Sequence, residues 1–149
     1  MNKKNYTILV IATVALLLTL AIPLAGCASE TSAPTGPSTA TLSSATMCRN
    51  YNSKTGPGDQ VDVFPRNASW ITCAVKLSDA PPGTKVKAVW LYKGTPRYTE
   101  VTGTSGTKWL AFDIKPKDMG ETVRFDAGDY AVKLFLNGEE KLTLSFKVE

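Results

Sequence analysis

Two patterns of hydrophobic and polar positions divide this chain. Residues 7 to 22 form a largely apolar run that closely follows Lys3 and Lys4. After residue 60, apolar and polar side chains instead alternate with a period of two, and no convincing helical periodicity appears. Such alternation is typical of β-strands that bury one face. The pattern therefore predicts a short apolar leader and, further along, an all-β domain.

The alternation divides the domain into short strands separated by turn sequences. The clearest strands are expected over 71–77, 85–93, 97–101, 108–114, 130–136 and 142–148. Turns are expected at 79–83, 94–96, 103–106 and 137–138, and a longer connection at 115–126. The pattern is weaker before residue 60, where it predicts a strand over 46–51 and a turn at 54–58; another short strand is expected over 61–64. About seven short strands with such regular turns predict an antiparallel β-sandwich.

The apolar leader ends in Leu24-Ala25-Gly26-Cys27. A short positive region, an apolar stretch and small residues before a cleavage point are typical of a secretory signal. With its cysteine, the segment resembles a bacterial lipoprotein signal peptide, whose lipobox has this Leu-Ala-Gly-Cys pattern. The resemblance implies that residues 1–26 are removed and that Cys27 is lipidated. The protein would then be exported and held on a bacterial membrane by its N-terminal lipid, in the outer leaflet of the cell membrane or in the outer membrane.

The alternative for this leader is a retained transmembrane anchor. Its apolar run of sixteen residues is short for a span of about 20 residues, and Pro23 and Gly26 interrupt it. Beyond Cys27, residues 28–45 are rich in serine, threonine and proline, so we expect residues 27–45 to form a disordered tether. Residues 46–149 then suffice for one small domain.

Charge and histidine content restrict the chemistry. The chain has 17 basic and 13 acidic residues, and removal of Lys3 and Lys4 with the leader leaves 15 basic residues. So small an excess does not favour nucleic acid as a partner. The sequence has no histidine, which excludes a Ser-His-Asp or Cys-His enzyme and any imidazole zinc site. We therefore expect no cofactor and no metal.

Four carboxylates gather in and just after the 115–126 connection, and a calcium site could use such oxygens. They belong to Asp118, Glu121, Asp126 and Asp129. Their spacing matches no calcium loop known to us, so the simpler interpretation is that they are solvated loop residues.

One local motif narrows the type of sandwich. The sequence Asp126-x-Gly128-x-Tyr130-x-Val132 resembles the tyrosine-corner region of the immunoglobulin family, Asp-x-Gly-x-Tyr-x-Cys. In that resemblance Cys73 takes the position of the first cysteine and Trp90 that of the core tryptophan. It implies an immunoglobulin-like fold for residues 60 to 149. Val132 stands where the family often has its second cysteine, so the usual disulfide between the sheets is not expected.

Cys48 and Cys73 remain once Cys27 is assigned to lipid. An even pair in an exported domain favours a disulfide between them. Closing a loop of about 25 residues in this way would contribute about 3 kcal/mol. The alternative is a buried apolar Cys73 and a free thiol at Cys48.

Aromatic residues are the candidate binding surface. Trp70 and Trp109 fall opposite the apolar positions of their strands, which predicts that both point outward. With Tyr98 they form our candidate contacts for a protein or glycan partner at the cell envelope. Because the two tryptophans begin antiparallel strands, they are expected at opposite ends, about 15–20 Å apart. The alternative is that each folds over the rim of the sandwich.

Three functions remain open at this point. The first is a membrane-tethered, non-catalytic module that presents a small sandwich for binding. The second is a structural or accessory subunit of an envelope complex, or an inhibitor-like domain. The third, an enzyme, is the least favoured, and a hydrolase would have to use carboxylates such as Asp113, Asp118 or Glu121.

Overall fold

The computed structural model describes residues 39–149, so the lipobox, Cys27 and the first part of the expected tether lie outside the described residues. The strands are β1 (Thr41–Cys48), β2 (Tyr51–Asn52), β3 (Gly56–Pro57), β4 (Val63–Phe64), β5 (Ile71–Tyr92), β6 (Thr95–Ile114), β7 (Gly128–Leu136) and β8 (Glu139–Val148). A 3-10 turn, η1 (Pro116–Met119), interrupts the connection between β6 and β7. No helix within 39–149 is long and apolar enough to cross a bilayer.

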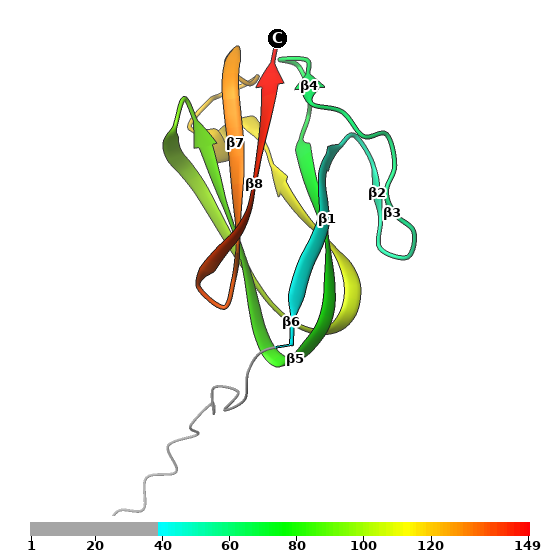
Figure 1. Ribbon diagram of the computed structural model, residues 1–149. Helices are drawn as coiled ribbons and strands as arrows, with labels where there is room; N and C mark the ends of the chain where they lie inside the picture. The colour runs from blue at the N-terminus through cyan, green and yellow to red at the C-terminus, as the bar shows by residue number, and fades with distance from the viewer. Residues whose placement is uncertain (1–38) are drawn as a thin grey trace, which may run out of the picture. The chain divides into compact units, whose positions relative to one another are not determined.

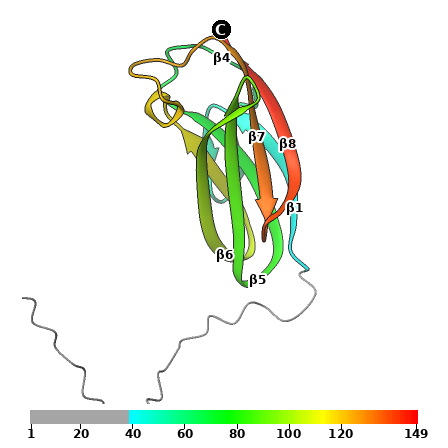
Figure 2. The ribbon, with the colours of Figure 1, turned by 90° about the vertical axis from the view of Figure 1, so that its left-hand side faces the viewer.

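A long bent ribbon of β5 and β6 joins two layers of strands (Figures 1 and 2). Residues 71–77 of β5 pair with 108–114 of β6 and, on the other side, with β1; we call these three the β1 layer. Residues 84–92 of β5 pair with 95–104 of β6 and with β7. Strands β8 and β4 extend this second sheet, the β7 layer.

The turns predicted at 79–83 and 103–106 were expected to end separate strands. This prediction is wrong, because β5 and β6 continue through both positions. Both strands bend together there, with register shifts on either side of the Ala80–Gly106 pair, and continue into the other layer. Asp79 and Gly83 take positive φ values of 53° and 85°, which sharpens the bend. Thr84 is fully buried, and its hydroxyl donates to the carbonyl oxygen of Pro81 at 2.7 Å, a hydrogen bond that stabilises the bend.

The core lies between the two layers. Trp90 is fully buried, as expected, and its ring meets that of Phe146 edge to face at 6.0 Å between centroids. Phe146 also packs on Phe64, at 5.7 Å. Cys73 and Val132, the two positions compared with the immunoglobulin cysteines, are both fully buried in this core. The buried set agrees with the inward faces that the alternation predicts.

The tyrosine corner is present. The hydroxyl of Tyr130 donates to the carbonyl oxygen of Asp126 at 2.9 Å and lies 3.1 Å from Oε1 of Glu121. Burial, and then the neighbouring Glu121 carboxylate, raise the pKa of Tyr130. The Asp126 carboxylate lies 3.9 Å from the guanidinium of Arg66. The contact that the motif predicts thus ties the start of β7 to the loop before it.

The folded domain begins earlier than expected. β1 starts at Thr41, inside the predicted tether, and Ala40 is already buried. A bulge then interrupts β1, because Ser43 is opposite Lys76 but Thr46 is opposite Ala74. Ser44 has a positive φ of 51° at this point. β4 runs parallel to β8, so the sandwich is not wholly antiparallel.

Candidate functional site

The two ends of the sandwich differ in character. The described chain enters at one end, where Thr41 pairs with Ser78 near the bend of the β5–β6 ribbon. The other end carries the loops that follow β4 and β6, the 93–94 turn and the C-terminus (Figure 1). Trp70 and Val123 lie in those loops and are 53% and 85% exposed. Two large exposed apolar side chains therefore lie at the end away from the chain entry, whereas Val101, opposite Lys87, is exposed nearer the bend.

Trp70 borders a hollow of about 240 Å³ at this distal end. We call it the Trp70 hollow; its lining residues are Arg49, Phe64, Pro65, Ala68, Ser69 and Trp70. Phe64 is buried at 2% exposure, so the hollow sits directly on the core. Its lining is mostly apolar, and its polar side-chain groups are the Ser69 hydroxyl, the Arg49 guanidinium and the Trp70 indole N–H, a composition that suits an apolar side chain of a ligand.

Backbone hydrogen bonds hold the loop that forms the hollow. The amide of Arg66 donates to the carbonyl oxygen of Glu149 at 3.0 Å, and the amide of Phe125 donates to the carbonyl oxygen of Arg66 at 3.0 Å. Within the loop, the amide of Ala68 donates to the carbonyl oxygen of Pro65 at 3.0 Å. The C-terminus and the 115–126 connection thus fix the position of the loop from both sides.

Trp109 is packed beneath a hairpin and is no part of this hollow. It lies on the outer face of the β1 layer, opposite Lys76, as the alternation predicts. The β2–β3 hairpin covers it, since Gly56 lies against its ring and Tyr51 donates to its carbonyl oxygen at 2.9 Å. Trp70 precedes Ile71, opposite Ile114, so the two tryptophans do lie toward opposite ends of neighbouring strands.

Tyr98 lies in a third place. It is opposite Trp90 on β6, on the core-facing side of the β7 layer, and is half-buried against the core. Burial, and then the carboxylates of Glu100 and Asp118, raise the pKa of its hydroxyl. The three aromatic residues proposed from the sequence are therefore not brought together, and among them Trp70 is the exposed one.

The candidate carboxylates have structural contacts. Asp113 accepts a hydrogen bond from the Thr72 hydroxyl at 2.6 Å. Asp118 accepts one from the amide of Lys115 at 2.9 Å and caps η1. Glu121 contacts the tyrosine corner. Within residues 39–149 no three acidic or cysteine side chains converge in a way that could hold a metal ion.

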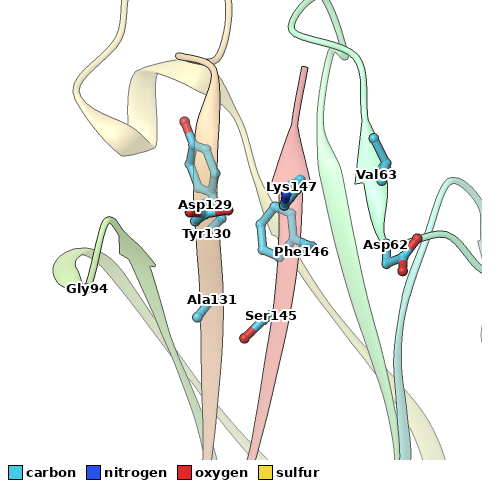
Figure 3. A pocket seen from close by; sticks show the side chains of 9 residues that line it. All are labelled: Asp62, Val63, Gly94, Asp129, Tyr130, Ala131, Ser145, Phe146 and Lys147. Atoms are coloured by element: carbon cyan, nitrogen blue, oxygen red, sulfur yellow. The ribbon is translucent and has the colours of Figure 1, made fainter.

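A second hollow, of about 440 Å³, lies across β7 and β8 on the outside of the β7 layer. Figure 3 shows Asp129 and Lys147 side by side on these strands, with Asp62 beyond β8. Ala131 and Ser145 lie one step further along the two strands and border the same hollow (Figure 3). It presents charged side chains above small residues and has no exposed aromatic ring, so it offers less apolar contact than the Trp70 hollow.

The expected Cys48–Cys73 disulfide is absent, and both cysteines are free and buried. After the bulge in β1, Cys48 is opposite Thr72 and Met47 is opposite Cys73. Cys73 thus faces the core, whereas Cys48 faces the outer side of the same sheet. Their Cβ atoms point to opposite faces, which a disulfide does not allow.

Comparisons with known proteins concern the fold. No family model matches the sequence, and no curated protein matches it. An immunoglobulin-like protein of Pseudomonas aeruginosa is similar in structure over 73% of this chain and 97% of its own, with a TM-score of 0.52 and 14% identity. This likeness confirms the immunoglobulin-like β-sandwich predicted from the tyrosine-corner motif.

Two enzymes also contain similar regions. The DNA glycosylase AlkC of Pseudomonas fluorescens has a TM-score of 0.45 at 15% identity, over 74% of this chain and 30% of its own. A β-glucosidase of Listeria innocua has a TM-score of 0.48 at 10% identity, over 74% of this chain and 16% of its own. This chain spans less than a third of either enzyme, and likenesses at these TM-scores carry no weight for its function.

Proposed function

We propose that this protein is a lipid-anchored, non-catalytic binding module of the bacterial cell envelope. Cys27 would hold it on the membrane, the tether would give it reach, and the sandwich would present its distal end to a partner. The observation that carries the proposal is the separation of Thr41 from Trp70 at opposite ends of the domain. A partner could then engage Trp70 without meeting the membrane.

The strand geometry sets the scale of this separation. β1 and the first half of β5 are antiparallel, and the chain enters opposite Ser78 while Trp70 precedes Ile71. Seven residues of extended strand between positions 78 and 71 span about 23 Å. An exposed apolar ring at such a distal position favours a contact with another molecule.

Binding is favoured over catalysis by the use of the polar groups. The carboxylates of the hydrolase alternative each make a structural contact. Asp113 accepts a hydrogen bond from Thr72, Asp118 caps the 3-10 turn, and Glu121 contacts the tyrosine corner. They come from different elements and border no common apolar hollow. These three carboxylates are therefore engaged in structural contacts and do not form an acid–base pair with one another.

Site-specific photo-crosslinking of the full lipidated protein in its membrane tests the proposal. A photoreactive amino acid at Ser69 should give adducts, whereas one at the exposed Lys108, near the entry end, should give none. The Cys27→Ser variant should leave the membrane fraction. Adducts from Lys108 alone, or unchanged membrane association of Cys27→Ser, would show that the protein is presented or held in another way.

A further inference from the structure

The Trp70 hollow contains a cation, Arg49, that has no ion-pair partner within residues 39–149. Residues 39–149 form three ion pairs, Arg66–Asp126, Lys133–Glu140 and Lys141–Glu139. Arg49 is exposed and takes part in none of them, and no side-chain hydrogen bond holds its guanidinium within this part of the chain. An unpaired guanidinium at the edge of an apolar hollow is complementary to a carboxylate.

Arg66 provides a comparison at the same end of the domain. Its guanidinium group lies beside Asp126, and its Nε donates to the carbonyl oxygen of Phe125 at 3.2 Å. The protein thus satisfies one distal arginine internally and leaves Arg49 beside Trp70 open. Among the residues that line the Trp70 hollow, Arg49 is the charged one.

The composition of the hollow favours a protein segment over a glycan. Besides the indole N–H of Trp70, only Arg49 and Ser69 carry polar side-chain groups among its lining residues. A sugar ring presents several hydroxyl groups, and those that are buried without a partner cost free energy. An aliphatic or aromatic side chain makes no such demand of Pro65 and Trp70. Tryptophan and arginine are also the residue types that most often dominate protein interfaces.

The hollow is ready to bind without a large rearrangement. Its floor, Phe64, is part of the core, and the amide of Glu149 donates to the Phe64 carbonyl oxygen at 3.0 Å. Because the loop from Pro65 to Trp70 is held by the hydrogen bonds described above, little conformational entropy is lost when a ligand binds. With a volume of about 240 Å³, the hollow accepts one side chain and its neighbours rather than a large ligand.

We infer that the Trp70 hollow binds an acidic protein segment, with an apolar side chain of the partner against Trp70 and a neighbouring carboxylate paired with Arg49. This inference rests on the proposed function and specifies the chemistry of the partner. A single apolar side chain and a charge-assisted hydrogen bond define a short linear motif, in which an Asp, Glu or C-terminal carboxylate lies beside a large apolar residue.

A random-peptide display library, selected on the full lipidated protein in nanodiscs, tests the inference. Enriched peptides should combine an acidic residue with an adjacent large apolar residue. Selection on Arg49→Glu should enrich basic residues beside the apolar one instead. Trp70→Ala should weaken the best peptide about tenfold or more, whereas the equally distal Val123→Ala should leave its affinity unchanged.

Three outcomes would overturn the inference. One is no enrichment over empty nanodiscs, and the second is enrichment that Arg49→Glu leaves acidic. The third is competition for the hollow by oligosaccharides containing uronic acid, which would assign it to a glycan. In each case adducts from Ser69 would still support a distal binding module, so the failure of this inference is distinguishable from failure of the proposed function.

Discussion

The ring of Trp109 lies so close to Gly56 that a Cβ atom added to this glycine would be 2.5 Å from Cε2 of the indole. Gly56 is buried and has a φ of 90°, a conformation that favours glycine. The β2–β3 hairpin can therefore cover Trp109 only with glycine at this position. The contact turns an outward-facing tryptophan into a small second core on the outer face of the β1 layer.

Gly56→Ala should destabilise the domain by about 1–3 kcal/mol, because the new methyl group overlaps the indole and the backbone is strained. Denaturant unfolding would show this as a lower midpoint. Gly103→Ala is the matched control, since Gly103 has open space around its Cβ position and its φ lies outside the left-handed region. Equal midpoints for the two variants would mean that the hairpin does not pack on Trp109.

The two outward tryptophans should differ in their effect on stability. Trp109→Ala removes the packing surface of the hairpin and should cost about 1–3 kcal/mol. Trp70→Ala removes a ring that is 53% exposed and should change stability by about 0.5 kcal/mol or less. Thermal unfolding of both variants checks this. A large loss of stability for Trp70→Ala would assign that ring to packing and remove it from the proposed site.

Tyr130→Phe should cost about 1–2 kcal/mol, because it leaves the carbonyl oxygen of Asp126 without its donor. Tyr92→Phe serves as the control, since the Tyr92 hydroxyl donates to the carbonyl oxygen of Ala127 at 3.2 Å in an exposed position. Its loss should be clearly smaller. If the free energies of unfolding show equal losses, the tyrosine corner adds nothing beyond an ordinary surface hydrogen bond.

The two buried cysteines should resist modification in the native state. Burial, and then the Asp113 carboxylate, raise the pKa of Cys48 to about 11; burial, and then Cys48, raise the pKa of Cys73 to about 12. At pH 8 without reductant, iodoacetamide should label neither thiol in the folded protein and both after denaturation. Mass spectrometry counts the labels. If both cysteines stay unlabelled in denaturant until a reductant is added, the two are joined by a disulfide and the prediction of free thiols is wrong.

The same pKa shifts predict a loss of stability at alkaline pH. The unfolded thiols ionise near 9.0 and the folded ones only near 11 and 12, so the unfolded state binds fewer protons above pH 9. Stability is then fully present below pH 9 and falls as the pH rises toward 12. The unfolding midpoint of the wild type should be lower at pH 10 than at pH 8. In a Cys48→Ala/Cys73→Ala variant this difference between the two midpoints should be smaller. If the difference is unchanged in the variant, another group causes the loss of stability at alkaline pH. Tyr130, whose pKa is also raised, is one such group.

Alternation along the chain predicts most strands and their inward faces, because one buried face leaves a clear period of two. It does not show that β5 and β6 continue through their bends. The sequence Pro81-Pro82-Gly83 has the composition of a turn, yet the partner strand bends with it and keeps the ribbon paired. Bends shared by two strands depend on contacts distant in sequence, which a local pattern does not contain.

The cysteine pairing illustrates how one residue changes a prediction. If the register that β1 has before the bulge at Ser44 continued, Cys48 would lie opposite Ile71, on the same face as Cys73. The extra residue shifts Cys48 opposite Thr72 and turns it to the other side. Serine does not reveal a bulge by its type, so the spacing of the cysteines alone could not exclude a disulfide.

The candidate site was predicted only in part. Trp70 is expected to be exposed because it falls out of phase with the apolar positions of β5. Arg49 has no such signal, since it lies in the weakly patterned region before residue 60, and its position beside Trp70 follows from the pairing of β1 with β5. Trp109 was expected to be equally outward. A turn was expected at 54–58, but nothing in the sequence shows that the β2–β3 hairpin folds over Trp109.

The opposite placement of Thr41 and Trp70 also determines how the domain would carry mechanical load. A pull between an anchored N-terminus and a ligand held at Trp70 would draw β1 and the first half of β5 past each other along their length. Their hydrogen bonds run perpendicular to the strands, so such a pull loads the paired residues together in shear instead of opening them one at a time. The arrangement that we propose for holding the distal end away from a membrane would therefore also resist rupture under tension.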